Sequence, residues 1–327
     1  MNTEKHTDFN NWPSNSDLIE AAARIKPYIH RTAVLTSELL NQVTGHHLFF
    51  KCENFQKAGA FKSRGAMNTI LSLDKLQLSS GVATHSSGNH AQALARAASL
   101  SGTKAYIVMP ETAPQAKVDA VKAYGGIITF CEPTLTAREQ TLKAVIAQTG
   151  AHEIHPYNDY RIIAGQASCF LELNEQSGPL DLVLCPVGGG GLISGTALAI
   201  HHFSPATKLI ACEPEGADDA FRSFKSGKLI PVSNTSTIAD GLLTSLGSLT
   251  FPIIKELVSD VVTVSDEYII EAMKLIWSRL KILVEPSAAV PLAALLQGKI
   301  AETKSRIGII VSGGNLDLNK LPWYGSK

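Results

Sequence analysis

Short apolar segments alternate with helix-like segments along most of the chain, and this alternation restricts the fold more than any other feature. The apolar segments mostly end in Gly, Pro or Ser. Such runs are typical of buried strands, because a strand covered on both faces needs apolar residues at nearly every position. We predict strands in HLFFKCE (47–53), GVATHSS (81–87), KAYIVMP (104–110), GIITFCE (126–132), DLVLCPVG (181–188), KLIACEP (208–214) and RIGIIVSGG (306–314).

Helical segments are predicted between many of these strands, at 90–100, 113–125, 135–150 and 192–203. A further segment, EYIIEAMKLIWSRLKIL (267–283), spaces apolar residues three and four apart, as a helix facing a core does. The turn-rich stretch 226–252 is expected to form loops over one face. This alternation predicts an α/β protein with parallel-rich sheets flanked by helices.

The composition argues against several classes of partner. The chain has 29 basic and 29 acidic residues, so nothing in its charge attracts nucleic acid or an anionic membrane. We find no apolar stretch of the roughly 18 residues that a membrane span needs, and no signal-peptide core in the first thirty residues. The five cysteines are scattered in apolar contexts, which is typical of buried thiols in a reducing compartment. We therefore expect a cytoplasmic protein of 327 residues with about two lobes.

Four predicted strands end in unusual sequences. These ends are THSSGNHAQALA (84–95), CPVGGGGLISG (185–195), ACEPEGADD (211–219) and IIVSGGNLD (309–317). In open α/β sheets, ligands bind at the carboxyl ends of the strands. The four segments are therefore the places where we expect chemistry.

The run of four glycines at 188–191 predicts a phosphate site. Without Cβ atoms the backbone can turn several N–H groups toward one point, and the helix that follows adds the positive end of its dipole. The alternative is a tight strand–helix turn, which usually needs fewer glycines. The spacing does not match the dinucleotide-binding fingerprint.

Lys62 lies in KAGAFKSRGA (57–66), between a phenylalanine and a Ser-Arg-Gly turn. Most lysines are solvated, and a structural role is the simplest interpretation. However, a phosphate site without a metal-hydrolase or catalytic-triad pattern favours a phosphorylated aldehyde cofactor, which needs one amine to form an imine. Lys62 is the candidate for that amine.

Four ordered motifs, FQKAGAFKSRGA, SSGNHAQALA, PVGGGGL and VSGGN, resemble those of the fold-type II pyridoxal-phosphate enzymes, the tryptophan-synthase-β-like family. The resemblance runs from about residue 16 to residue 323. VLTSELLNQVTGHHLFFKCENFQKAGAFKSRGA and IADGLLTSLGSLTFPIIKEL are most similar to its branch of serine racemases and serine/threonine dehydratases. This resemblance implies a two-lobed α/β fold. A large cofactor-binding domain would comprise residues 1–79 and 156–327, and a small mobile domain, residues 80–155, would close over the substrate.

The resemblance also implies roles for particular residues. Lys62 would form the imine link to pyridoxal 5'-phosphate, with Phe61 packed near its ring. The other cofactor contacts implied are Asn89 for the phenolic oxygen, Ser312 for the pyridine nitrogen, and Gly188, Gly189, Gly190 and Gly191 for the phosphate. The substrate contacts implied are Ser86, Ser87, Asn89, His90 and Arg138.

Racemisation of an amino acid needs proton carriers on both faces of Cα. The resemblance assigns Lys62 to one face and Ser87 to the other, where a hydroxyl needs hydrogen bonds or a proton chain to act as a base. Taken alone, Ser87 is a helix-capping serine, and the two uses are compatible. β-Elimination needs Lys62 only. Ser312 cannot keep the ring nitrogen protonated as a carboxylate does, which favours racemisation and elimination over transamination.

Two positions point in opposite directions within this branch. Arg138 matches the racemases, although by itself it would be an arginine on a helix surface. Tyr157 stands where racemases usually have asparagine and is more typical of dehydratases, which puts cofactor contacts and substrate choice in doubt. GQAS (165–168) and Ala33 are further departures from the usual GQGT and proline.

A cation site is implied by EPEGADD, with Glu213, the main-chain carbonyl of Ala217 and Asp219 as ligands. Read alone, such an acidic turn is a solvated loop. Oxygen ligands are typical of Mg²⁺ or Ca²⁺, with Mn²⁺ as a further candidate.

ATP is a candidate activator, because some serine racemases bind it between subunits. The positions that match its contacts are Ser37, Lys57, Gln92, Tyr124, Lys281 and Asn315. Glu38 and Ala58 depart from the expected hydroxyl residues, and Glu38 would repel a triphosphate. The resemblance also implies a homodimer. The chain has nothing after Lys327 to form a regulatory domain, so we do not expect a large allosteric biosynthetic dehydratase.

The resemblance therefore implies the activity of a serine racemase, which interconverts L- and D-serine and also eliminates water from serine, giving pyruvate and ammonia. The first alternative is a catabolic dehydratase of L-serine, L-threonine or threo-3-hydroxyaspartate with little racemisation. The second, from another class, is a non-catalytic nucleotide-binding α/β module in which the glycine run holds a nucleotide phosphate.

Overall fold

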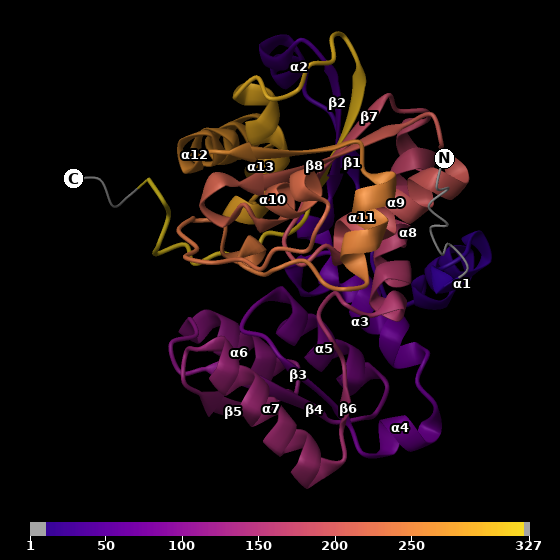
Figure 1. The fold of residues 1–327 in the computed structure, drawn as a ribbon, viewed down its shortest axis with the longest axis vertical. Helices are drawn as coiled ribbons and strands as arrows, with labels where there is room; N and C mark the ends of the chain where they lie inside the picture. Colours follow the sequence, from indigo (N-terminus) through magenta and orange to yellow (C-terminus); the bar gives the residue numbers. More distant parts are fainter. Residues whose placement is uncertain (1–10, 324–327) are drawn as a thin grey trace, which may run out of the picture.

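Two parallel-rich sheets form the centre of the structure, a computed structural model that describes residues 11–323 (Figure 1). The six-stranded sheet has the order β1-β2-β10-β7-β8-β9, and the four-stranded sheet has the order β5-β4-β3-β6. Every pairing is parallel except the antiparallel pair of β1 and β2. The strands are β1 (Val34–Leu35), β2 (His47–Cys52), β3 (Val82–His85), β4 (Ala105–Pro110), β5 (Ile127–Cys131), β6 (His152–Glu153), β7 (Leu182–Pro186), β8 (Lys208–Pro214), β9 (Asp260–Val264) and β10 (Arg306–Val311).

All seven predicted strands are confirmed, and three others were not predicted. Two of these, β1 and β6, have two residues each and therefore show no pattern along the sequence. The third, β9, is an edge strand in which only Val261 and Val264 are buried, unlike the continuous apolar runs of the strands inside the sheet.

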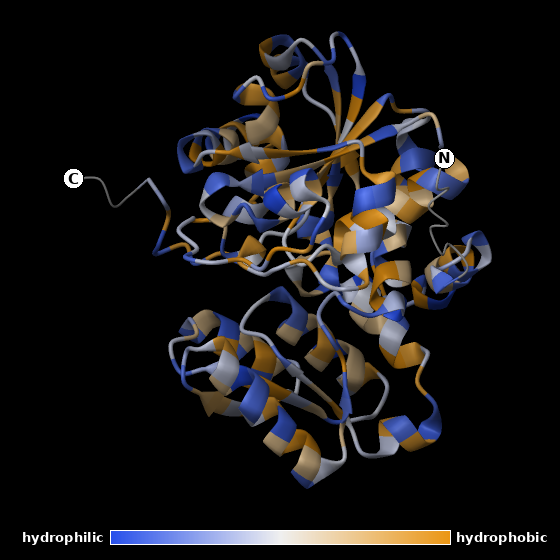
Figure 2. Ribbon diagram, viewed as in Figure 1, coloured by the Kyte–Doolittle hydropathy of each residue, from blue (hydrophilic) through white to orange (hydrophobic). Residues whose placement is uncertain are grey.

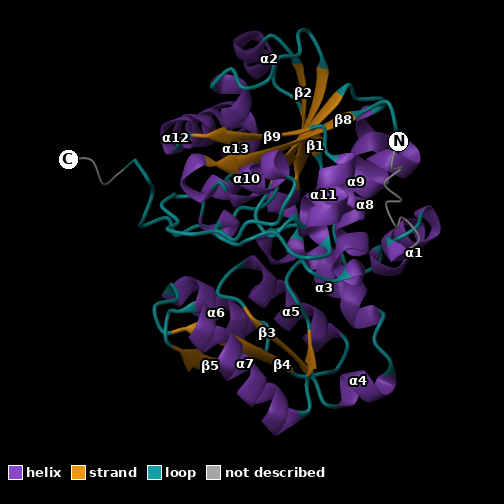
Figure 3. Ribbon diagram, viewed as in Figure 1, coloured by secondary structure: helices purple, strands orange, loops and turns teal. Residues whose placement is uncertain are grey.

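Helices cover both sheets, and the predicted α/β architecture is confirmed (Figure 3). They are α1 (Asn15–Ile25), α2 (Glu38–Thr44), α3 (Lys62–Leu71), α4 (Lys75–Ser79), α5 (Asn89–Leu100), α6 (Gln115–Ala123), α7 (Leu135–Thr149), α8 (Tyr160–Ser177), α9 (Gly191–Phe203), α10 (Asp219–Ser226), α11 (Thr250–Leu257), α12 (Asp266–Leu275) and α13 (Pro286–Leu296). The helix predicted over 267–283 is shorter than expected: α12 is followed by a π-helical turn, Ile276–Leu280, and Lys281 adopts a left-handed backbone. The stretch 226–252 is mostly loop, as predicted, with one 3₁₀ turn at Asp240–Leu242.

The six-stranded sheet is buried on both faces, and its strands show the two-residue period of that burial. In β7, Val183 and Cys185 pack toward α8, α9 and α11, whereas Leu182 and Leu184 pack toward α12 and α13. This arrangement explains the continuous apolar run DLVLCP, since neither face contacts water. Figure 2 shows the same distribution, with apolar strands inside and polar residues on the outer helix surfaces. None of the helices within 11–323 combines the length and apolar character that a membrane span requires.

The four-stranded sheet and its helices form a second, smaller lobe (Figure 1). We call residues 82–153 the small lobe and the part built on the six-stranded sheet the large lobe. One face of the small sheet packs on α3, α5 and α6, and the other face packs on α7. The chain enters this lobe through α3 and α4 and returns before α8. The predicted boundaries at 79/80 and 155/156, and the mobility of the lobe, stay predictions.

The carboxyl ends of several strands from both lobes point to the junction between them, where loops gather (Figure 3). An ion pair also joins the lobes there: Lys117 Nζ of α6 lies 2.5 Å from Asp240 Oδ2 of the 3₁₀ turn. The segments that carry the predicted motifs therefore meet at one place in the molecule.

Candidate active site

Lys62 is the first residue of α3, and its amine lies between two aromatic rings. Its Nζ is 5.2 Å from the centroid of Phe61 and 5.9 Å from the centroid of Tyr157. The same atom donates a 2.8 Å hydrogen bond to the carbonyl oxygen of Pro156. None of the described carboxylates compensates the charge, and burial lowers the pKa of Lys62 to about 8. A lysine with a lowered pKa is neutral more often at pH 7, which is the form that attacks a carbonyl carbon.

A buried network of charged residues supports the start of α3. Arg64, two residues after Lys62, donates from Nε and Nη2 to the two carboxylate oxygens of Glu53, at 2.7 Å each. It also donates to both oxygens of Glu172, which accepts a 2.6 Å bond from Lys51 Nζ as well. The side chains of Lys51, Glu53 and Arg64 are completely buried. This network has no signature in the sequence, because its four members come from three separate segments.

The glycine loop after β7 has the properties of an anion site. Gly188, Gly189 and Gly190 are buried, and within residues 11–323 no protein acceptor pairs with their N–H groups. Gly190 has φ +91°, and α9 begins at Gly191, so the positive end of its dipole lies at this loop. Buried amides without a partner are rare in proteins, and a phosphate is the kind of group that satisfies them. The loop therefore fits the phosphate of the predicted cofactor.

Tyr157 lies directly on the glycine loop. A Cβ atom added to Gly189 would be 2.3 Å from Tyr157 Cδ1, and one added to Gly191 would be 2.9 Å from Tyr157 Cβ. Burial raises the pKa of Tyr157 to about 12, so the ring remains a neutral phenol. This residue, which departs from the racemase pattern, is therefore adjacent both to Lys62 and to the loop.

The SSGNH segment (86–90) connects β3 to α5, as predicted. The N-cap of α5 is Gly88, and no side chain caps the helix, so the capping role considered for Ser87 is wrong. Ser86 Oγ accepts a 3.3 Å bond from Gly88 N. His90 is buried; its Nε2 lies 3.3 Å from the carbonyl oxygen of Ile154, and its Nδ1 has no partner among the described residues. Ser87 stays a predicted catalytic residue.

Strand β10 brings Ser312 next to the lysine segment. The carbonyl oxygen of Ser312 accepts a 3.0 Å hydrogen bond from Phe61 N, and Gly313 forms a bridge with Ala60. Ser312 is buried, at the carboxyl end of a central strand. Ser312, the predicted partner of the pyridine nitrogen, is thus bonded to Phe61, the residue before Lys62.

Glu285 is a member of the site that the sequence analysis missed. It is buried, and its Oε1 accepts a 2.8 Å bond from Asn89 Nδ2. Burial, and next the charge of Asp240, raise the pKa of Glu285 to about 7. An acidic residue followed by proline is common at the start of a helix. The sequence VEPSA therefore did not indicate a functional role for Glu285.

His155 was also missed. Its Nδ1 accepts hydrogen bonds from the N–H groups of Tyr157, at 3.3 Å, and Asn158, at 2.9 Å. Burial lowers the pKa of His155 to about 4, helped by the positive charges of His85 and Lys62. The neutral ring therefore shapes the turn that carries Pro156 and Tyr157.

Arg138 lies on α7, near His85. Burial lowers the pKa of His85, and the positive charge of Arg138 lowers it further. Its Nε makes a weak 3.4 Å bond to the carbonyl oxygen of Thr134, and no described carboxylate pairs with it. His85 is the last residue of β3, so Arg138 lies near the SSGNH segment. Its substrate-binding role stays a prediction.

The predicted cation ligands follow β8. Glu213 is buried and accepts bonds from the N–H groups of Ala220, at 3.0 Å, and Phe221, at 2.9 Å. Asp219 Oδ2 accepts a 3.2 Å bond from Leu246 N, whereas its Oδ1 is buried without a described partner. Burial raises the pKa of Glu213 to about 8 and that of Asp219 to about 6. Between residues 11 and 323 no group of three or more His, Cys, Asp or Glu side chains forms a metal cluster, so a cation here would need Ala217 and waters.

Three of the six positions matched to a nucleotide site, Lys57, Gln92 and Asn315, lie on neighbouring segments. Asn315 Nδ2 donates a 2.7 Å bond to the carbonyl oxygen of Ala58, next to Lys57, and α5, which carries Gln92, packs on that turn. Ser37 instead caps α2, where its hydroxyl accepts from Leu40 N. Tyr124 ends α6, and Lys281 follows the π-helical turn.

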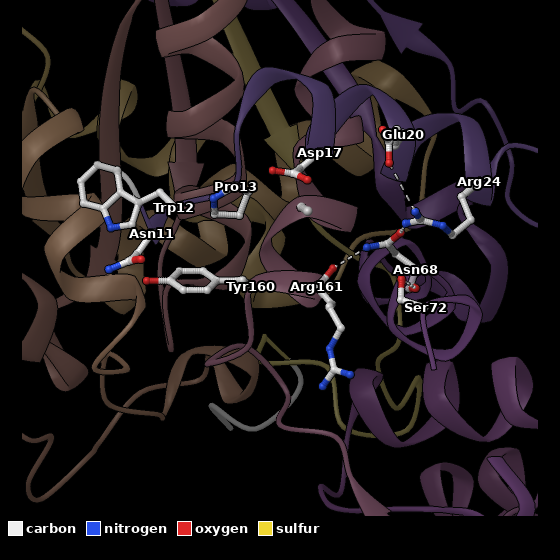
Figure 4. Close-up of a pocket in the computed structure, with 11 residues that line it drawn as sticks. Asn11, Trp12, Pro13, Asp17, Glu20, Arg24, Asn68, Ser72, Tyr160 and Arg161 are labelled. Atoms are coloured by element: carbon white, nitrogen blue, oxygen red, sulfur yellow. Dashed lines mark hydrogen bonds and ion pairs between the residues drawn. The ribbon is translucent and has the colours of Figure 1, made fainter. Parts of the chain in front are cut away.

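A separate cavity of about 490 Å³ lies between α1, α3 and α8 (Figure 4). Trp12, Arg24, Tyr160 and Arg161 line it, and none of the predicted site residues does. Its charged groups are already paired: Arg24 donates to Asn68 Oδ1 at 2.7 Å, and Arg161 pairs with Asp159 at 2.7 Å. We therefore place the candidate active site at Lys62.

Comparison with known proteins shows the family of the chain. Residues 25–313 match the family described as pyridoxal-phosphate dependent enzyme. The chain is 55% identical over 311 residues to the beta-hydroxyaspartate dehydratase of Paracoccus denitrificans, covering 95% of this chain and 99% of that protein. It is 54% identical to the serine racemase of Arabidopsis thaliana, covering 94% of both. The structure of maize serine racemase superposes with a TM-score of 0.92 at 50% identity, covering 95% of this chain and 96% of that one.

Proposed function

Because the chain belongs to the pyridoxal-phosphate dependent enzymes, we propose that it racemises serine and also eliminates water from it. The observation that carries this proposal is the half-buried amine of Lys62, which has a lowered pKa and lies near the rings of Phe61 and Tyr157. Tyr157 in turn lies on the glycine loop, whose N–H groups have no described acceptor. Relatives named serine racemase, 44–54% identical over most of the chain, support the choice of reaction.

The residues at the junction fit the cofactor that the family implies. The N–H groups of Gly188–Gly191 would hold its phosphate, Asn89 its phenolic oxygen, and Ser312 its pyridine nitrogen. When bound, pyridoxal phosphate withdraws electrons from Cα of an amino acid and makes the α-proton acidic. Lys62, with a pKa near neutrality, is then suited to take that proton and to return it.

Two outcomes follow from the removal of one proton. If Ser87 gives a proton to the face opposite Lys62, the configuration at Cα is inverted. If the β-hydroxyl leaves with a proton supplied by Lys62, serine loses water and goes on to pyruvate and ammonia. Ser86, Asn89, His90 and the dipole of α5 would bind the substrate carboxylate, with Arg138 as a further contact.

A specific observation favours a second candidate, the dehydration of 3-hydroxyaspartate. Tyr157, the residue typical of dehydratases, lies on Gly189, and a beta-hydroxyaspartate dehydratase is among the relatives at more than 50% identity. Arg138 has no described carboxylate partner and is therefore available for the second carboxylate of such a substrate.

The test is to supply L-serine, L-threonine and both diastereomers of 3-hydroxyaspartate to the purified enzyme. D-serine is measured by chiral chromatography, and pyruvate and other 2-oxo acids are measured in the same samples. D-serine together with pyruvate from L-serine supports the racemase. Rapid 2-oxo acid formation from 3-hydroxyaspartate without D-serine supports the dehydratase. A colourless protein that gains no visible band with added cofactor would instead favour the nucleotide-binding module.

We further propose a divalent cation, Mg²⁺ first and Ca²⁺ or Mn²⁺ next, bound by Glu213, Ala217 and Asp219. The buried, unpaired Oδ1 of Asp219 supports it. ATP as an activator through the six matched positions stays a prediction.

We also propose a homodimer in the cytoplasm. Phe55 and Leu283 are apolar and more than 40% exposed, and Asn54, next to Phe55, donates to the carbonyl oxygen of Leu283 at 3.0 Å. All five cysteines are free and buried, as in proteins of a reducing compartment.

A further inference from the structure

The amide of Asn89 is held on two sides in the structure. Its Nδ2 donates to Glu285 Oε1 at 2.8 Å, and its Oδ1 accepts from Asn315 Nδ2 at 2.9 Å. Glu285 lies 196 residues away in the sequence, in a different lobe from Asn89. The contact therefore crosses the junction at the point where the cofactor is expected.

Counting donors and acceptors fixes the orientation of this amide. A backbone carbonyl only accepts hydrogen bonds, so Asn315 Nδ2 faces Ala58 O, and the same nitrogen then donates to Asn89 Oδ1. This leaves the nitrogen of Asn89 facing Glu285. Asn315 uses both hydrogens of its own Nδ2, one toward Ala58 O at 2.7 Å and one toward Asn89 Oδ1. After these bonds, the Asn89 nitrogen has one N–H left, and its oxygen cannot turn toward the same place without losing both partners.

Glu285 is itself held firmly. Its Oε2 accepts from the backbone N–H of Asn315 at 3.2 Å, and a Cβ atom on Gly313 would lie only 2.6 Å from its Oε1. The carboxylate thus contacts the turn that follows Ser312 as well as Asn89. It touches two segments that are expected to contact the cofactor, although it is not expected to contact the cofactor itself.

We propose that Glu285 is a positioning residue that fixes the Asn89 amide so that one N–H is always directed to the phenolic oxygen of the cofactor. This inference rests on the proposed function, since it assumes that the cofactor binds at Lys62. Asp240 and Lys117 are the charged groups whose fields act on Glu285, with opposite effects on its pKa. In its ionised form this carboxylate only accepts hydrogen bonds, which keeps the Asn89 amide from turning over.

The experiment compares the visible absorption spectrum of the bound cofactor and its affinity in four proteins: the wild type, Glu285→Gln, Asn89→Ala and the double variant. Affinity is measured by equilibrium dialysis of pyridoxal phosphate against the cofactor-free proteins. Glutamine keeps the shape of Glu285 but can present an N–H to Asn89. We expect Glu285→Gln to shift the visible band and to weaken binding about tenfold, the loss of one charge-assisted hydrogen bond.

If Glu285 acts through Asn89, the double variant must give a specific result. In the Asn89→Ala background, Glu285→Gln should change neither the spectrum nor the affinity any further. Full additivity in the double variant, or a wild-type spectrum and affinity for Glu285→Gln, would overturn the proposal. Asn54→Ala is the matched control, because Asn54 holds the same segment through Leu283 O without contacting Asn89, and it should leave the spectrum unchanged.

Two other outcomes are also decisive. If the wild type binds no pyridoxal phosphate, the proposed function fails and this inference fails with it. If Glu285→Gln does not fold, Asn315→Ala provides the test, since it removes the partner of Asn89 Oδ1 and leaves Glu285 in place. An unchanged spectrum for Asn315→Ala would then count against a fixed amide.

Discussion

Lys62 Nζ and the carbonyl oxygen of Pro156 are 2.8 Å apart, and their hydrogen bond joins the two places where the chain passes between the lobes. Lys62 begins the helix that leads into the small lobe, and Pro156 lies on the segment that returns from it. An amine that binds a cofactor must give up this bond, so cofactor binding is linked to the geometry of the junction.

Replacing Lys62 with methionine should abolish activity and stabilise the cofactor-free protein. Its pKa of about 8 lies below the ordinary lysine value, so folding is penalised for holding a buried cation. That penalty is complete below about pH 8 and decreases as the pH rises from there to the pKa of the unfolded chain, 10.5. We expect a gain of about 1 kcal/mol at pH 7 in thermal melting, since the lost bond to Pro156 offsets part of the benefit.

The control for this experiment is Lys75→Met, which removes an exposed lysine of α4. Lys75→Met should not produce a gain in stability at pH 7 that disappears as the pH rises. Equal behaviour of the two variants would mean that Lys62 is solvated.

Ser87→Ala should separate the two reactions. Without a proton carrier on the second face, formation of D-serine from L-serine should fall by about 10²- to 10⁴-fold. Pyruvate formation needs Lys62 only and should be partly retained. Both products are measured in one sample, so pyruvate reports that the variant is folded and loaded. Continued racemisation would show that another group serves the second face.

Gly189→Ala should weaken cofactor binding because of a steric conflict with Tyr157. The new methyl group would lie 2.3 Å from the ring, and overpacking of this kind costs about 1–3 kcal/mol. Adding Tyr157→Ala to the same chain removes the ring and should restore much of the affinity, as measured by dialysis of pyridoxal phosphate. Without such a rescue, the ring cannot be the cause of the loss.

Mg²⁺ should raise the melting temperature of the wild type, and Asp219→Asn should remove this effect. A ligand at a hundred times its dissociation constant stabilises the folded state by about 2.7 kcal/mol. Asp218→Asn is the matched control, because Asp218 is the adjacent carboxylate but pairs with Arg222 at 2.8 Å. If Asp218→Asn loses the response and Asp219→Asn keeps it, the ligands have been assigned wrongly.

Most of the architecture was predictable because buried parallel strands leave a strong signal. Runs such as LVLCP and IGIIV are apolar on both faces, and each ends where a polar or glycine-rich loop begins. The strand β9 was missed because this edge strand includes Asp260 and Thr263 and is not a continuous apolar run. The end of α12 was also misjudged, since the π-helical turn keeps helical spacing up to Leu280.

The site was predictable where one motif carried one role, and unpredictable where contacts crossed the fold. Lys62 and the glycine loop stand out in short segments. Glu285 became visible only when folding brought it to Asn89. The supposed cap at Ser87 failed for a local reason, because α5 begins at Asn89 and its N-cap is Gly88, one residue after Ser87.

The quartet of Lys51, Glu53, Arg64 and Glu172 limits how this sequence can diverge over time. Two positive and two negative groups share an interior with almost no water access, so losing any one of them leaves its counterpart uncompensated at a cost of about 3–5 kcal/mol. Related sequences should therefore either keep all four residues or replace them together. Near the reactive amine, only substitutions that keep these charges balanced should be tolerated.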